Sequence, residues 1–225
     1  AVIHGIGQGC LQAGATLIGG ETAEMPELYA KQDYDLAGFC VGAVDKRAII
    51  KGDKVAPGHI LIGLASSGPH ANGYSLIHKI LRQHNCDLDH KLGDQTLAEI
   101  LLTPAFIYVK PILQLIEQVN VLAIAHITGG GLIENIPRVI PKETKAVITA
   151  NYWQIPPIFQ WLQQTGRVSW SEMYRTFNCG IGMVVCVAEQ DADQTLDLLE
   201  KNDQQAWPIG RIEARLGDEA QVVIA

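Results

Sequence analysis

The chain has 225 residues, of which 48% are hydrophobic and 18% are charged, so it can bury a sizeable core and does not have the composition of a disordered protein. The 17 Lys and Arg residues against 24 Asp and Glu residues give a formal net charge of -7, which opposes binding to a nucleic-acid backbone. No apolar run approaches the ~20 residues that cross a bilayer, which argues against a membrane protein.

The N-terminus and the cysteines indicate a reducing compartment. The first ten residues lack the charged start and apolar stretch of a secretory signal. The five cysteines are odd in number and contain no C-x-x-C pair, so we predict neither a disulfide framework nor a zinc knuckle. We therefore expect a cytoplasmic protein.

The first 50 residues contain three apolar segments around an acidic loop. Apolar residues at helical spacing predict a helix over 2–13, with Gly14 at its C-terminal end. Short apolar runs predict strands over 15–18 and 35–45. The chain begins inside the predicted helix and without Met, so we expect that an N-terminal part of the protein precedes it.

A change in composition at 46–58 predicts a domain boundary, with one domain over 1–50 and another over 51–225. The predicted strands of the second domain are 59–65, 121–127, 145–149, 182–188, 208–214 and 221–225. Its predicted helices are about 75–84, 95–102, 105–119, a short one ending near Arg138, 156–166 and 191–201. Because strands and helices interleave without a regular βαβ repeat, we predict an α+β protein: a partial N-terminal domain followed by a mixed β-sheet flanked by helices.

The acidic loop follows the first predicted strand. Gly19 and Gly20 are followed by Glu21, Thr22 and Glu24. Mg²⁺ on nucleotide phosphates takes one or two carboxylates and completes its shell with phosphate and water, so this spacing suits such a site. A solvated turn before an acidic helix start, stabilised by about 0.3–1 kcal/mol, explains the same residues equally well.

A triple glycine, Gly129, Gly130 and Gly131, lies between a predicted strand and a predicted helix. The free N–H groups of such a turn form a ready anion site, which Asn135 and Arg138 would flank. A tight turn with Arg138 exposed is the ordinary alternative.

The loop after strand 59–65 offers Ser66, His70 and Asn72, which could hold a sugar or a phosphate. His70 taken alone is more often a surface or satisfied histidine than a catalytic one. Further along, Arg175 and Asn178 lie beside glycines, where a packed turn is the ordinary explanation.

Complete nucleotide-binding and hydrolase motifs are missing. The sequence has no G-x-x-x-x-G-K-[ST], and the glycines of GIGQGC do not complete G-x-G-x-x-G. LASSG matches only the second half of a nucleophile elbow, which makes Ser66 a weak candidate for a hydrolase nucleophile.

Five blocks in order give a more specific signal than any one pattern. They are GGETAEMPELY at 19–29, DYDLAGFCVGAV at 33–44, SSGPHANGYSL at 66–76, HITGGGLIENIPRV at 126–139 and MYRTFNCGIGM at 173–183. Together they resemble the phosphoribosylformylglycinamidine cyclo-ligases of purine biosynthesis. Members of that family have a further N-terminal stretch. The resemblance therefore implies that 1–50 is the end of an ATP-binding, dimer-forming domain and that 51–225 is a complete α/β sandwich domain.

The resemblance also implies a reaction, in which ATP drives ring closure of formylglycinamidine ribonucleotide to aminoimidazole ribonucleotide in a homodimer that uses Mg²⁺. His70, the one side chain of the set that titrates near neutrality, is the candidate for proton transfer. The ATP or phosphate ligands would be Gly19, Gly20, Glu21, Thr22, Gly129, Gly130 and Gly131. The substrate ligands would be Ser66, His70, Asn72, Thr128, Asn135 and Arg175, and Glu21 and Glu24 would hold the metal.

Three alternatives stay open at this point. Thiamine-monophosphate kinase, selenophosphate synthetase and formylglycinamidine synthetase share the two-domain plan and the use of ATP. The chain could instead be a binding or dimerisation module without activity, or a serine hydrolase acting through Ser66. ATP binding separates the module from the enzymes, and acylation of Ser66 by a fluorophosphonate identifies the hydrolase.

Overall fold

The computed structural model describes all 225 residues and separates into two compact units, Ala1–Ile49 and Ile50–Ala225, called here the N-terminal and the C-terminal unit. None of the helices is both long enough and apolar enough to cross a lipid bilayer.

The N-terminal unit contains one helix, α1 (Val2–Ala13), which confirms the predicted helix. It ends at Gly14, whose left-handed backbone (φ 72°) lets its N–H donate back to the carbonyl of Leu11 at 3.2 Å. The rest of the unit has no helix or strand, so the predicted strands over 15–18 and 35–45 are wrong. A β-strand requires backbone hydrogen bonds to an adjacent strand, and neither segment has such a partner strand in this unit.

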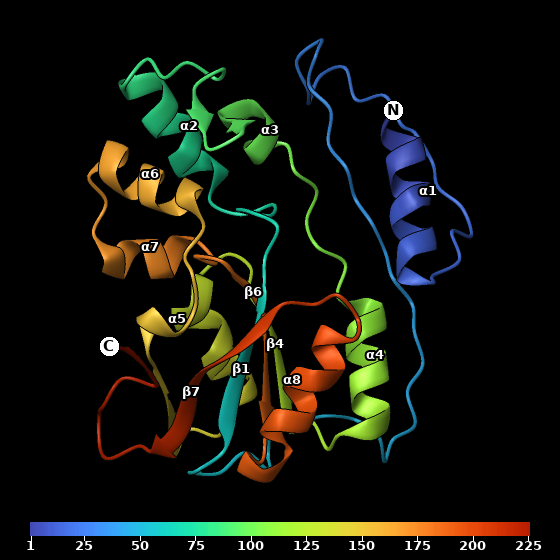
Figure 1. The fold of residues 1–225 in the computed structure, drawn as a ribbon. Helices are drawn as coiled ribbons and strands as arrows, with labels where there is room; N and C mark the ends of the chain where they lie inside the picture. The colour runs from blue at the N-terminus through green and yellow to red at the C-terminus, as the bar shows by residue number, and fades with distance from the viewer. The chain divides into compact units, whose positions relative to one another are not determined.

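The C-terminal unit is built on one six-stranded sheet (Figure 1). Its strands are β1 (Ile60–Ala65), β4 (Ala123–His126), β5 (Thr144–Ile148), β6 (Ile181–Val187), β7 (Ala206–Ala214) and β8 (Val222–Ile224). They lie in the order β4-β6-β1-β7-β5-β8, antiparallel except for the parallel pair β5 and β8. The prediction of a mixed sheet is therefore confirmed, and each of the six strands predicted for this region is present.

Helices cover both faces of this sheet. The helices are α2 (Tyr74–Gln83), α3 (Leu97–Leu101), α4 (Val109–Gln118), α5 (Gly131–Asn135), α6 (Pro157–Gly166), α7 (Trp170–Thr176) and α8 (Ala192–Glu200), with short 3-10 turns at Ile136–Val139, Ala150–Tyr152 and Glu189–Asp191. Along β1, Leu61 packs into the core under α2, α3 and α5–α7, whereas Ile62 and Leu64 pack into the core under α4 and α8. Burial on both faces explains why the strands read as continuous apolar runs rather than alternating ones.

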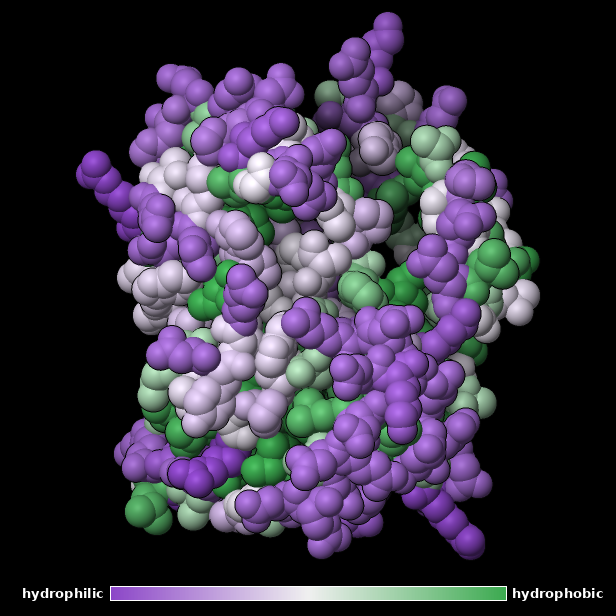
Figure 2. Space-filling model, viewed as in Figure 1, coloured by the Kyte–Doolittle hydropathy of each residue, from purple (hydrophilic) through white to green (hydrophobic).

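Figure 2 shows hydrophilic residues over α8, the outer side of one of these helical layers, with apolar patches between polar ones elsewhere on the C-terminal unit. The helix therefore buries one face and exposes the other, as its sequence pattern indicates.

Two features of this unit were not predicted. One is a two-stranded hairpin, β2 (Lys91–Leu92) and β3 (Gln95–Thr96), of which β3 lies at the start of the helix predicted over 95–102. Its Gly-Asp turn is a recognisable hairpin signal. The other is helix α7, whose second half falls in the segment from Met173 that was interpreted as a packed turn. Its N-cap Ser169 accepts a hydrogen bond from the N–H of Glu172, and a Ser three residues before a Glu is a sequence signal for a helix start.

Candidate functional site

The loop that follows β1 holds His70 in an unusual conformation. The backbone of His70 is left-handed (φ 56°), and the residue is only 6% exposed. Its ring nitrogen Nε2 accepts hydrogen bonds from the backbone N–H groups of Ser67 at 3.1 Å and Phe106 at 3.4 Å. Sterically disfavoured backbones that the surroundings hold in place concentrate at functional sites, which marks this loop as a candidate.

Burial changes the protonation of His70. Loss of hydration, and secondarily the nearby His126, lower the pKa of His70 to about 4. The ring is therefore neutral at pH 7. The expectation that His70 titrates near neutrality needs correction, because the sequence could not reveal how deeply this loop is buried.

Asn178 ties the same loop to the turn after α7. Its Oδ1 accepts hydrogen bonds from the Ser66 hydroxyl at 3.0 Å and the Gly180 N–H at 2.9 Å, and its Nδ2 donates to the Gly68 carbonyl at 2.9 Å. Asn178 is 2% exposed and is a structural link between two loops, where its sequence context indicates only an ordinary turn. The Ser66 hydroxyl donates to an amide oxygen, which is not a base, so the geometry gives no support to the serine hydrolase alternative.

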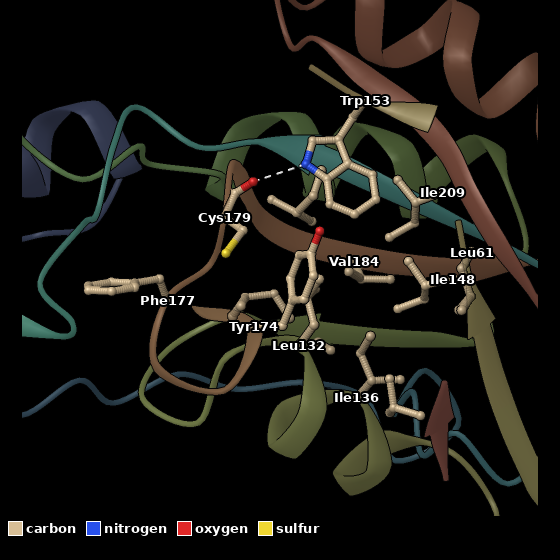
Figure 3. Packing of buried hydrophobic residues seen from close by; sticks show 14 of the residues in the cluster. Leu61, Leu132, Ile136, Ile148, Trp153, Tyr174, Phe177, Cys179, Val184 and Ile209 are labelled. Atoms are coloured by element: carbon tan, nitrogen blue, oxygen red, sulfur yellow. Dashed lines mark hydrogen bonds between the residues drawn. The ribbon is translucent and has the colours of Figure 1, made fainter. Parts of the chain in front are cut away.

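The turn itself is anchored in the core. Trp153 donates from its indole N–H to the carbonyl of Cys179 at 3.0 Å, and Figure 3 shows this bond above the buried side chains of the cluster, including Phe177. Cys179 is fully buried, and burial raises the pKa of its thiol, so it is an inert packing residue.

The triple glycine forms a turn that Asn135 organises from inside. Asn135 Nδ2 donates to the carbonyls of Thr128 at 3.3 Å, Gly129 at 3.2 Å and Gly131 at 2.8 Å. Its Oδ1 accepts from the Thr128 hydroxyl at 3.2 Å and from Arg138 at 3.0 Å. Asn135 is 4% exposed, and both atoms of its side-chain amide are hydrogen-bonded within the turn. The residue therefore shapes the turn.

The loop, the glycine turn and the end of α7 lie next to one another. A carbon added at Gly129 would lie 3.7 Å from Oδ1 of Asn72, and one added at Gly131 would overlap the carbonyl oxygen of Tyr174 and lie 2.7 Å from that of Phe177. The structure thus gathers most of the predicted substrate and phosphate residues of the C-terminal unit. Arg175 lies in the last turn of α7 with an exposed side chain that forms no ion pair.

The predicted metal residues, and the predicted ATP residues other than the glycine turn, belong to the N-terminal unit. Gly19, Gly20, Glu21, Thr22 and Glu24 are all exposed, in a segment without helix or strand. No group of three or more His, Cys, Asp or Glu side chains in the structure could hold a metal ion. The two carboxylates match the one or two that Mg²⁺ takes from protein when nucleotide phosphates and water supply its other ligands.

Comparison with known proteins identifies the family to which this fold belongs. Residues 56–223 match the family model described as AIR synthase related protein, C-terminal domain. This match covers most of the chain, and the chain therefore belongs to that family.

The family resemblance found in the sequence is also confirmed. The chain is 56% identical over 221 residues to the phosphoribosylformylglycinamidine cyclo-ligase of Nitrosococcus oceani. The similarity covers 98% of this chain and 62% of that relative, so the chain spans less than two thirds of the relative's length.

Solved structures share the fold at low identity. The hydrogenase maturation protein HypE of E. coli matches with a TM-score of 0.51 and 19% identity, over 77% of this chain and 48% of that one. The thiamine-monophosphate kinase of Stenotrophomonas maltophilia matches with a TM-score of 0.52 and 16% identity, over 80% and 54% respectively. These similarities establish the α+β fold and carry no statement about the reaction.

Proposed function

We propose that the chain is part of an ATP-dependent cyclo-ligase that closes the imidazole ring of formylglycinamidine ribonucleotide and yields aminoimidazole ribonucleotide, ADP and phosphate. One observation carries this proposal: the 56% identity to a cyclo-ligase, which extends over 98% of the chain. The segments that form the candidate site, including the loop 66–73 and the glycine turn, lie within that matched length.

The chemistry explains why ATP is used. An amide oxygen is a poor leaving group, so the terminal phosphoryl group of ATP passes to that oxygen and ADP is released. The neighbouring amidine nitrogen then attacks the same carbon, the ring bond forms, the carbon–oxygen bond breaks and phosphate departs. Because both reacting groups belong to one molecule, effective molarities of about 10⁵ to 10⁸ M are available once the substrate is held folded. The protein mainly positions groups and neutralises charge.

In this proposal the C-terminal unit binds the substrate. Ser66, Asn72, Thr128 and Arg175 contact its polar groups, and the backbone N–H groups of Gly129, Gly130 and Gly131 hold a phosphate. Asn135 acts by shaping that turn, which the five hydrogen bonds of its side-chain amide support. His70 contacts the substrate as a neutral ring, since burial lowers its pKa to about 4.

The N-terminal unit would hold the nucleotide. Gly19 and Gly20 admit the phosphates, Thr22 lies beside them, and Glu21 and Glu24 hold Mg²⁺. The metal would neutralise phosphate charge during transfer. The exposed carboxylates, three residues apart, support this assignment. We further propose that the whole protein is cytoplasmic and forms a homodimer. Sedimentation analysis tests the dimer directly.

The deciding experiment measures ADP release and ring formation from ATP and formylglycinamidine ribonucleotide. It uses the Nitrosococcus oceani relative and the same relative with its matching segment replaced by these 225 residues. Turnover by the exchanged protein supports the proposal. A folded exchanged protein that binds both substrates and forms no ring contradicts it.

Two pairs of variants in that protein test the residue assignments. Glu21→Gln should raise the Mg²⁺ concentration needed for turnover, whereas Glu27→Gln, an exposed acid of the same loop, should not. His70→Ala should raise the Michaelis constant for the ribonucleotide, whereas His78→Ala, exposed on α2, should leave it unchanged. An unaltered Mg²⁺ dependence in Glu21→Gln removes the metal role, and an unaltered Michaelis constant in His70→Ala removes the substrate contact.

A further inference from the structure

The segment 103–108, which joins α3 to α4, has no helix or strand and is hydrogen-bonded to the end of β1 and to the loop 66–73 that follows it. Three hydrogen bonds connect the two: the Ser67 hydroxyl to the Pro104 carbonyl at 2.7 Å, the Phe106 N–H to His70 Nε2 at 3.4 Å, and the Tyr108 hydroxyl to the Ala65 carbonyl at 2.7 Å. The contacts are made to Ala65 at the end of β1, to Ser67 and to His70. They therefore hold the strand end and the loop at three points rather than at one.

The same contacts decide where the proton of the His70 ring lies. Nε2 accepts one N–H from Ser67, within its own loop, and one from Phe106, in the segment. A ring nitrogen that accepts a hydrogen bond carries no proton, so in the neutral ring the proton is on Nδ1. Nδ1 is buried and has no hydrogen-bond partner within the chain. A buried donor without a partner is costly, so this placement of the proton depends on the two hydrogen bonds that Nε2 accepts.

Tyr108 links this arrangement to the sheet. It is 4% exposed, and burial raises the pKa of its phenol, so the hydroxyl stays protonated and remains a donor to Ala65. Under it lies Gly182 of β6: a carbon added there would overlap the Tyr108 hydroxyl and lie 2.6 Å from Cε1 of His70. Tyr108 and His70 therefore pack side by side against a strand that leaves room for both.

We propose that segment 103–108 is a positioning element of the candidate site, which fixes the orientation of the His70 ring and keeps its proton on Nδ1. Phe106 acts through its backbone N–H, and Tyr108 and Ser67 act by holding the segment on the loop. The role of His70 in the candidate site rests on the proposed function, but the protonated nitrogen is a property of the chain itself.

The test is nitrogen-15 magnetic resonance of the His70 ring in the 225-residue chain at pH 7, with the signals assigned by their loss in His70→Gln. We expect Nδ1 to be protonated in about tenfold excess or more over Nε2, equivalent to about 1.4 kcal/mol. Phe106→Pro removes the N–H and the ring and should lower this excess severalfold. Phe106→Ala removes the ring, retains the N–H and should preserve the excess. A ring protonated mainly on Nε2, or equal effects of the two variants, overturns the proposal.

A second pair of variants covers the case in which circular dichroism shows Phe106→Pro unfolded. Tyr108→Phe should lower the excess, because it frees the segment from Ala65. Tyr74→Phe removes another hydroxyl that donates to a backbone carbonyl, that of Leu101, and should leave it unchanged. Equal ratios in wild type, Tyr108→Phe and Tyr74→Phe contradict the positioning role. Ring closure is not measured here, so failure of the proposed reaction and failure of this inference are separate results.

Discussion

The two units contain similar apolar runs with opposite outcomes. In the C-terminal unit, ILIGLA and its neighbours pair into a sheet that helices cover on both faces. In the N-terminal unit, LAGFCVGAV forms no strand, and Phe39 is 99% exposed. No residue of 1–49 is buried. An apolar run therefore shows which residues favour burial, but a strand also needs a neighbour to satisfy its backbone groups.

The largest expected contrast comes from the same substitution in both units. Phe159→Ala, in the core of the C-terminal unit, should lower the free energy of unfolding by about 3–5 kcal/mol, because it removes buried apolar surface and leaves a cavity. Phe39→Ala should change it by less than about 0.5 kcal/mol. Urea unfolding followed by circular dichroism measures both. A large loss in Phe39→Ala would mean that this side chain is buried in solution.

The next contrast is between a buried and an exposed histidine. The pKa of His70 is about 4 in the folded chain, against the ordinary histidine value of 6.5 that applies in the unfolded chain. Between these two pH values the unfolded chain therefore binds more protons than the folded chain. The free energy of unfolding should therefore rise with pH across this window, by at most about 3 kcal/mol. This contribution of His70 is fully present above pH 6.5 and is lost as the pH falls to 4.

Urea unfolding between pH 4 and pH 7.5 measures this dependence. His70→Asn should flatten the slope, whereas His4→Asn, exposed on α1, should keep it. An unchanged slope in His70→Asn would assign the pH dependence to other groups.

The glycine turn offers a sharper contrast between neighbouring positions. Gly131 has φ 56° and faces backbone carbonyls, so Gly131→Ala should lower the free energy of unfolding by about 1–3 kcal/mol. Gly129 has room for a carbon, and Gly129→Ala should change it less. Thermal unfolding of the two variants tests whether the turn is as closely packed as the structure indicates. Equal losses would show that it is not.

The smallest expected effect concerns a helix start. Ser169→Ala removes the N-cap of α7 and should lower the free energy of unfolding by about 1 kcal/mol. Ser171→Ala, exposed on the same helix, is the matched control. In contrast, α1 has Ala1 at its N-cap and no side-chain cap, so Ala1→Ser should alter stability little if that helix contributes little to the folded core. Differential scanning calorimetry of the three variants resolves these differences.

The site was only partly predictable. The glycine turn, Ser66, His70 and Asn72 stand out in the sequence, because small residues and polar loops after strands are local signals. Asn178 was noted only as part of a packed turn, and its link to the loop was missed because its partner Gly68 is 110 residues away in the chain. The segment 103–108 was also missed: its end was included in a helix over 105–119, whereas α4 begins at Val109. Its contacts with Ala65, Ser67 and His70 join residues far apart in the sequence, and no local pattern encodes them.

Local pattern was enough to specify the six strands of the sheet, most helices of the C-terminal unit and the glycine-rich turns, because propensity, spacing and capping act over a few residues. Tertiary structure alone decided that 15–18 and 35–45 are not strands, that His70 is neutral, and that Asn135 and Asn178 organise loops. Burial and hydrogen bonding depend on atoms brought together from distant parts of the chain, and the protonation of a ring or the existence of a strand follows from those atoms.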